Sequence, residues 1–150
     1  MSTKIDETDK EILNILQDDA RTSFRIVAQK LGVSESTVYM RVKKMEKNGV
    51  ITGYRTVIDS RKVGKNLLAF VLVRAKPTLY IEVLDALKEI DEIYEVYDVT
   101  GTYYAVLKVR TKDPVELASI LDKIGTLEGV DSTETAVVLR IKKENLKIKL

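Results

Sequence analysis

The spacing of apolar residues changes once along this 150-residue chain, and that change most constrains the fold. Up to Gly49, apolar side chains recur at intervals of three and four residues, which is typical of amphipathic helices. From Leu67 onward, short apolar runs that favour strands alternate with two stretches of helical spacing. The chain is therefore expected to have a helical part at residues 1–58, a polar linker at 59–66 and a mixed part at 67–150.

The first part is expected to contain three helices. The first falls within residues 5–20 and begins at Asp6 or Thr8, because Thr8 and Glu11 also fit a capping box. The second falls within residues 21–31. A third helix runs between Gly32 and Gly49, and its buried face is expected to carry Val38, Val42 and Met45. A short strand or strand pair is expected at 50–58.

The third helix has the features of a DNA recognition helix. Ser34 is expected to be its N-cap, and the turn before it contains Gly32, as in a helix-turn-helix. In the major groove, the first turn of such a helix reaches base edges, while lysines further along bind phosphates. The residues expected at the DNA are Ser34, Ser36, Thr37, Met40 and Arg41, followed by Lys43, Lys44 and Lys47.

Charge supports this interpretation. Residues 20–65 hold eleven basic and three acidic side chains, although the net charge of the whole chain is only +2. A solvated basic face explains any single cation in this block. The coincidence of the block with the helix-turn-helix pattern favours a polyanionic partner, namely double-stranded DNA.

Composition excludes several classes of function. The chain contains neither cysteine nor histidine, so it lacks disulfides, thiolate chemistry, the usual general base and the commonest metal ligand. We expect no enzyme activity, cofactor or metal site. No apolar run approaches the about 20 residues that span a bilayer, and the first residues are too acidic and too short in apolar core to be expected as a signal peptide, so the cytoplasm is the expected location. Richness in Lys and Glu without Cys favours a thermophilic source.

The second part follows the order β-α-β-β-α-β, the ferredoxin-like plan. Strands are expected at 67–75, 93–99, 104–110 and 131–139, with a further edge strand in the tail at 142–150. Thr78 and Asp113 are expected to cap the two helices. The fold class is thus α+β, a winged-helix-like helix-turn-helix domain followed by a ferredoxin-like domain. Two helices cover only one apolar face of such a sheet, so a second copy is expected to cover the other in a homodimer.

Several stretches together resemble the Lrp/AsnC (feast/famine) family of bacterial and archaeal transcription regulators. They are IDETDKEILNILQDDARTS and LGVSESTVYMRVKKMEKNGVITGY in the first part, and VTGTYYAVLKV in the second. The resemblance covers essentially the whole chain and favours an archaeal member. It implies a sequence-specific DNA-binding regulator whose homodimers assemble to octamers or other multiples, and an amino-acid effector held in the C-terminal domain.

The resemblance also implies an effector site. The turn at residues 101–104 matches the effector loop of the family, and the strand near Thr133 often faces it. The residues so implied are Asp98, Gly101, Thr102, Tyr103, Tyr104, Thr133, Glu134 and Thr135. Relatives commonly carry an acidic residue where this chain has Tyr104. Tyr104 therefore either lines a ligand pocket or packs across a dimer interface.

Two other functions compete with a regulator. An architectural protein that wraps or bridges DNA with little sequence preference would show the same basic helix. Siroheme decarboxylases share the two-domain plan, but they are expected to use histidines, which this chain lacks.

Overall fold

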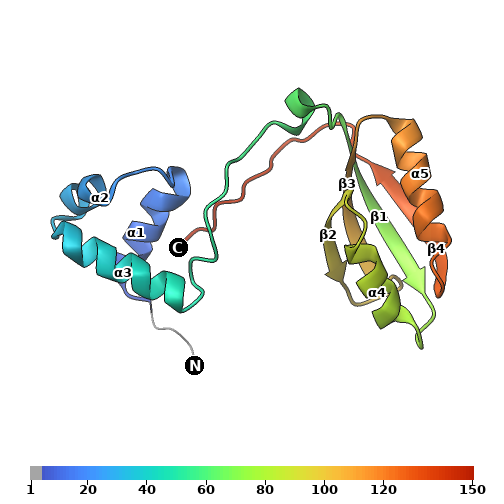
Figure 1. Cartoon of the computed structure of the whole chain (residues 1–150), viewed down its shortest axis with the longest axis horizontal. Helices are drawn as coiled ribbons and strands as arrows, with labels where there is room; N and C mark the ends of the chain where they lie inside the picture. The colour runs from blue at the N-terminus through green and yellow to red at the C-terminus, as the bar shows by residue number, and fades with distance from the viewer. Residues whose placement is uncertain (1–4) are drawn as a thin grey trace. The chain divides into compact units, whose positions relative to one another are not determined.

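The computed structural model describes residues 5–150, so the first four residues of the expected helical part lie outside the described chain. It divides into two compact units (Figure 1). The first unit joins the chain up to Val57 with Lys143–Leu150, and the second comprises Ile58–Lys142. The last eight residues, expected in the second part, thus pack with the first.

The first unit is built from three helices, α1 (Glu7–Asp18), α2 (Phe24–Leu31) and α3 (Glu35–Lys47). Asp6 is the N-cap of α1, and its capping box is closed by Asp9, so the predicted box of Thr8 and Glu11 is wrong. Apolar side chains from all three helices form one core, which contains Ile12, Leu13, Leu16, Val27, Ala28, Val38, Val42 and Met45. The predicted buried face of α3 is confirmed.

Two strands predicted around this unit are absent from the described chain. Residues 52–59 run without a ladder partner, so the strand expected at 50–58 is wrong. Residues 142–150 likewise form no edge strand. Periodicity predicted an extended backbone in both places but carried no information on a pairing partner. A 3₁₀ helix, η1 (Ser60–Val63), occupies the segment expected as a linker.

The second unit is a four-stranded antiparallel sheet with two helices. Its strands are β1 (Leu67–Ala75), β2 (Ile93–Asp98), β3 (Ala105–Thr111) and β4 (Val130–Val137), in the order β2-β3-β1-β4. The helices are α4 (Tyr80–Lys88) and α5 (Pro114–Gly125). This is the predicted ferredoxin-like topology.

Both helices lie on the same face of the sheet (Figure 1). Alternate β1 residues from Ala69 to Ala75 face them and are buried, together with Leu107 and Val109 of β3. The other face is here called the open face. Asp113 caps α5 as predicted, whereas the predicted cap Thr78 is wrong, because the N-cap of α4 is Leu79, which makes no side-chain hydrogen bond.

Candidate nucleic-acid interface

The start of α3 gathers three hydroxyl groups. The backbone N–H of Thr37 donates to Ser34 Oγ at 3.1 Å, which makes Ser34 the N-cap as predicted. The Ser34 hydroxyl also lies 2.9 Å from Ser36 Oγ and 2.7 Å from Thr37 Oγ1. Gly32 ends α2 with φ of 67°, a left-handed conformation that L side chains rarely adopt, and this brings the cap of α3 close behind α2.

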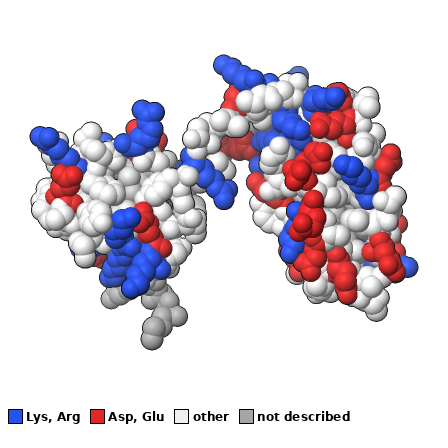
Figure 2. Space-filling model, in the orientation of Figure 1, with Lys and Arg blue, Asp and Glu red and all other residues white. Residues whose placement is uncertain are grey.

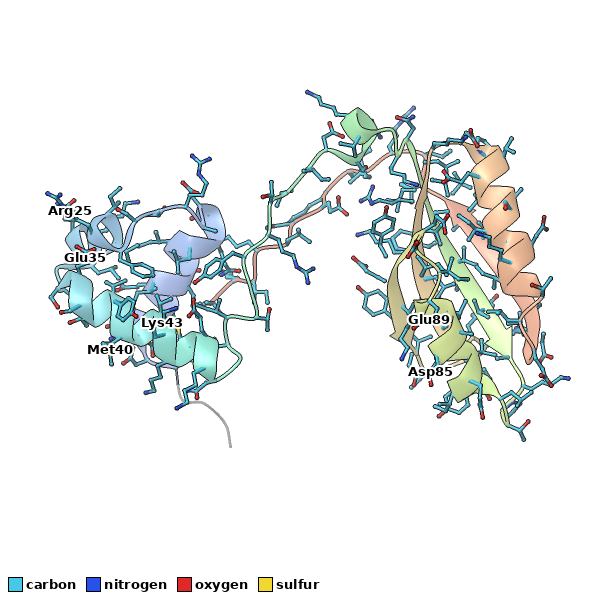
Figure 3. The ribbon with its side chains drawn as sticks, in the orientation of Figure 1. Arg25, Glu35, Met40, Lys43, Asp85 and Glu89 are labelled. Atoms are coloured by element: carbon cyan, nitrogen blue, oxygen red, sulfur yellow. The ribbon has the colours of Figure 1, made fainter. Side chains whose placement is uncertain are left out.

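The outward face of α3 carries most of the predicted DNA-binding residues. Val38, Val42 and Met45 dock the helix on the core, so side chains about half a turn away project to solvent. Met40 is 65% exposed, and Figure 3 labels it on α3 together with Lys43. The exposed residues of this face are Ser36, Met40, Lys43, Lys44 and Lys47. Basic side chains gather over α3 in Figure 2.

Arg41 differs from the other predicted residues, because it turns toward α1. Its guanidinium donates to Asp6 Oδ2 at 2.7 Å and to Asp9 Oδ1 at 2.9 Å. The hydrogen bond from Arg41 holds the pKa of the Asp6 carboxyl below its usual value. Asp9 is buried. The ion pairs join the start of α1 to the middle of α3, so Arg41 braces the recognition helix.

One side of α3 carries residues that sequence reasoning missed. The ring of Tyr39 packs edge-on against Phe24 of α2, with ring centroids 6.2 Å apart, and Lys43 Nζ lies 5.9 Å from the centroid of the same ring. Lys43 also pairs with Glu46 at 2.7 Å, and Glu46 accepts a hydrogen bond from the Tyr54 hydroxyl at 3.0 Å. The four-residue spacing of Tyr39 and Lys43 was the available signal.

The predicted effector residues lie on both faces of the sheet. The Tyr103 hydroxyl donates to Glu134 of β4, and Arg74 of β1 lies 5.3 Å from the centroid of the Tyr103 ring. Glu134 pairs with Leu72, on the open face. Thr133 and Thr135 instead pair with the buried Val73 and Val71, on the face that carries the helices. Tyr103 and Glu134 are therefore brought together, whereas the two threonines are not.

Tyr104 packs inward. Its ring stacks on Tyr80 of α4 with centroids 5.0 Å apart, and its backbone N–H donates to the carbonyl of Val73 at 2.9 Å. Both tyrosines pack against the core of the second unit. In this unit, Tyr104 thus joins the sheet to α4. Gly101 and Thr102 are exposed in the turn, and Asp98 is exposed at the end of the edge strand β2.

Other kinds of site find no support in the described chain. Residues 5–150 contain no group of three or more acidic, His or Cys side chains placed to hold a metal ion. None of the helices in the same residues has the length and apolar character that crossing a membrane requires.

Fold and surface together define a class of protein. A helix-turn-helix with a capped, outward-facing basic helix, followed in the chain by a separate ferredoxin-like unit, is the architecture of a two-domain DNA-binding protein.

Comparisons with known proteins give the family. Residues 5–52 match the model of a winged helix-turn-helix DNA-binding domain, and residues 68–148 match that of the Lrp/AsnC ligand binding domain. The chain belongs to the Lrp/AsnC family of transcription regulators, as its sequence motifs predicted, and family members are regulators.

Individual relatives are similar over nearly their whole length. The HTH-type transcriptional regulator FL11 of Pyrococcus furiosus is 40% identical over 144 residues, which are 96% of this chain and 95% of the relative. The structure of E. coli AsnC is 34% identical, covers 94% of this chain and 96% of its own, and superposes with a TM-score of 0.90. A Neisseria meningitidis transcriptional regulator, solved with L-methionine, is 23% identical with a TM-score of 0.91 and 97% of both chains covered.

Proposed function

We propose that this chain controls transcription as a homodimer, or a multiple of dimers, that lays α3 in the major groove of operator DNA. The observation that carries the proposal is the division of α3 into a buried stripe and an outward face. The buried stripe fixes the helix on its unit, and the outward face offers hydroxyl groups, a flexible thioether and cations. Because the target is chromosomal DNA, the protein would act in the cytoplasm.

Within this proposal, base edges and phosphates are held by different residues. Ser36, Thr37 and Met40 lie on the first two turns of α3, where a helix in the major groove reaches bases. The lysines at 43, 44 and 47 follow toward the C-terminus and bind phosphates. Arg41 supports reading by holding α3 against α1 through its two carboxylate partners.

An architectural DNA-binding protein is the second candidate, since the same lysines bind any sequence. Selection of bound DNA from a random pool, followed by footprinting of a selected site, separates the two. We expect an enriched two-half-site sequence with discrete protection. Even coverage that grows with protein concentration, without an enriched sequence, would replace the regulator with an architectural protein.

The proposed effector is a small molecule of the amino-acid class, bound by the second unit. Support comes from the match of this unit to the Lrp/AsnC ligand binding domain and from the Neisseria meningitidis relative solved with L-methionine. The exposed turn at Gly101 supplies backbone N–H groups suited to a carboxylate. Relatives commonly carry an acidic residue where this chain has Tyr104, whose ring is stacked on Tyr80. The ammonium group of an effector would therefore be met by Glu134 or Asp98.

Calorimetry with each of the twenty amino acids tests this effector class. We expect one or a few to bind and to change operator affinity, and operator DNA should change the affinity for the amino acid by the same factor, because binding linkage is reciprocal. Absence of heat with all twenty would exclude the ordinary amino acids and leave the DNA-binding proposal untouched.

A further inference from the structure

The C-terminal segment Lys143–Leu150, here called the tail, packs with the first unit although it follows β4 of the second. Only the residues 138–142 separate it from β4. The tail thus reaches the DNA-binding unit directly from the strand that carries Thr133 and Glu134.

A reciprocal hydrogen bond pair fixes the tail to α1. Gln17 Nε2 donates to the carbonyl of Ile148 at 3.0 Å, and the Ile148 N–H donates to Gln17 Oε1 at 2.7 Å. The side-chain amide therefore satisfies both backbone polar groups of one residue, as a neighbouring strand would. This pairing specifies which tail residue docks, because a shift by one residue would break both hydrogen bonds.

An ion pair beside these hydrogen bonds places a positive charge at the C-terminal end of α1. Asp18 is the last residue of α1, and the last turn contains no basic residue, so its carboxylate faces the negative end of the helix dipole. Lys147 Nζ lies 2.7 Å from Asp18 Oδ1 and brings a cation to that end. The Lys147 N–H donates to Asn145 Oδ1 at 2.9 Å, a local turn that shapes the tail before its contact.

The tail forms one side of a groove of about 720 Å³ in the first unit. Its walls come from α1 and from the extended residues 50–57, and alternate tail residues line it, namely Leu146, Ile148 and Leu150. Leu146 remains 73% and Ile148 69% exposed, so apolar burial contributes little. The contacts of Gln17 and Lys147 therefore decide whether the tail is docked.

We propose that the tail, which forms one wall of this groove and is held to α1 by Gln17 and Asp18, acts as a latch on the DNA-binding unit. Docking fixes the end of α1, the helix whose start is joined to α3 by Arg41. A change at β4 reaches the DNA-binding unit through the tail, in addition to the connection at residues 58–66. The effect on DNA affinity rests on the proposed function, whereas docking itself does not.

The test measures docking and DNA binding separately in the full-length protein. Docking is followed by hydrogen exchange of the Ile148 amide, which donates to Gln17. Gln17→Leu removes both hydrogen bonds at similar volume and should speed this exchange about tenfold. Lys147→Glu should speed it about two- to fivefold and lower affinity for a selected DNA site by a similar factor. The Asp18→Lys, Lys147→Glu double variant should restore both.

Lys149→Glu is the matched control, because it changes the net charge equally, two residues further along the tail, and leaves the contact with Asp18 in place. Equal losses of DNA affinity in both variants would mean that tail charge acts on DNA directly, which overturns the latch. Unchanged exchange at Ile148 in Gln17→Leu would overturn docking. Faster exchange with unchanged DNA affinity would overturn the link to DNA binding.

Two further outcomes separate docking within one chain from docking on a second copy, and failure of the latch from failure of the proposed function. Mixing the Asp18→Lys protein with the Lys147→Glu protein should leave the exchange of Ile148 as fast as in each variant alone, and slower exchange after mixing would mean that the tail docks on a second copy. If the parent protein bound no DNA, the proposed function would fail, while the pattern of Ile148 exchange would still decide whether the tail docks.

Discussion

Arg41 lies on the recognition helix α3, but its guanidinium donates hydrogen bonds to two carboxylates at the start of α1. A base contact would require breaking hydrogen bonds of 2.7 and 2.9 Å and would leave the buried Asp9 without its cation. Removing one partner of a partly buried pair costs more than the pair contributes, because the remaining charge stays desolvated. Arg41 therefore cannot both hold α3 against α1 and contact a DNA base, and the observed hydrogen bonds favour the contact with α1.

Arg41→Met should lower the free energy of unfolding of the first unit by about 1 to 2 kcal/mol, between the values for exposed and buried ion pairs. Chemical denaturation followed by helical circular dichroism measures it. Arg25→Met, at an exposed position on α2, is the control and should change stability little. If Arg41→Met kept full stability but lost discrimination between operator bases, Arg41 would be a base reader, as the sequence pattern predicted.

The same contact predicts a dependence on pH. Because the hydrogen bond from Arg41 lowers the pKa of Asp6, the folded state binds this proton less readily than the unfolded chain. Asp6 thus contributes stability above the unfolded pKa of about 4, and that contribution is lost as pH falls through the lowered value. Asp6→Asn should be less stable than the parent at pH 7, with the difference closing below about pH 4. A difference that stayed constant from pH 7 to pH 2 would contradict this origin.

At the scale of elements, the sequence predicted helices and strands well where local signals agree. Ser34 and Asp113 are strong N-caps followed by regular apolar spacing, and both helices start where expected. Thr78 had the right chemistry but was not used, since α4 begins two residues later without a side-chain cap. A residue with capping chemistry therefore does not by itself fix where a helix starts.

What the sequence could not predict depends on contacts between distant residues. Gln17 and Ile148 are 131 positions apart, so no local pattern indicated that the tail would pack on α1 rather than pair as an edge strand. Arg41 lies 35 positions from Asp6, and a basic residue on an exposed helix face looks the same whether it meets DNA or a carboxylate. The division of Thr133, Glu134 and Thr135 between two faces, by contrast, follows from the alternation of side chains along one strand and was open to prediction.

The basic end of α3 gives a prediction for the element as a whole. Lys44 and Lys47 are exposed in its second half. Lys44→Ala and Lys47→Ala should each weaken binding to all DNA sequences and reduce the slope of log affinity against log salt by about one. Binding measured at several salt concentrations gives the slope. Lys123→Ala, on α5 of the second unit, is the control and should leave it unchanged. A loss confined to one DNA sequence would mean that these lysines read bases.

At the scale of the whole molecule, the open face of the sheet is the interface that we propose for the homodimer. Register places Phe70 and Leu72 of β1 on this face, beside Val106 of β3 and Tyr97 of β2. Phe70 is 36% and Tyr97 51% exposed, although both are large; Phe70 lies on the inner strand β1 and Tyr97 on the edge strand β2. Apolar side chains grouped in this way are suited to an interface, and we propose a second copy as the partner, because a two-fold axis brings such a face against itself.

Phe70→Lys should therefore dissociate the assembly, because two lysines would meet across a two-fold interface. Light scattering of the eluting protein measures the mass. Val115→Lys is the matched control: Val115 is 78% exposed on α5, so it carries the same change of charge away from the open face and should keep the parent mass. A Phe70→Lys monomer should still bind a single half-site weakly, since its helix-turn-helix is intact, but lose the affinity that comes from occupying two half-sites together. If Phe70→Lys kept the parent mass, the open face would not hold the dimer, and the pairing of two recognition helices on one operator would need another interface.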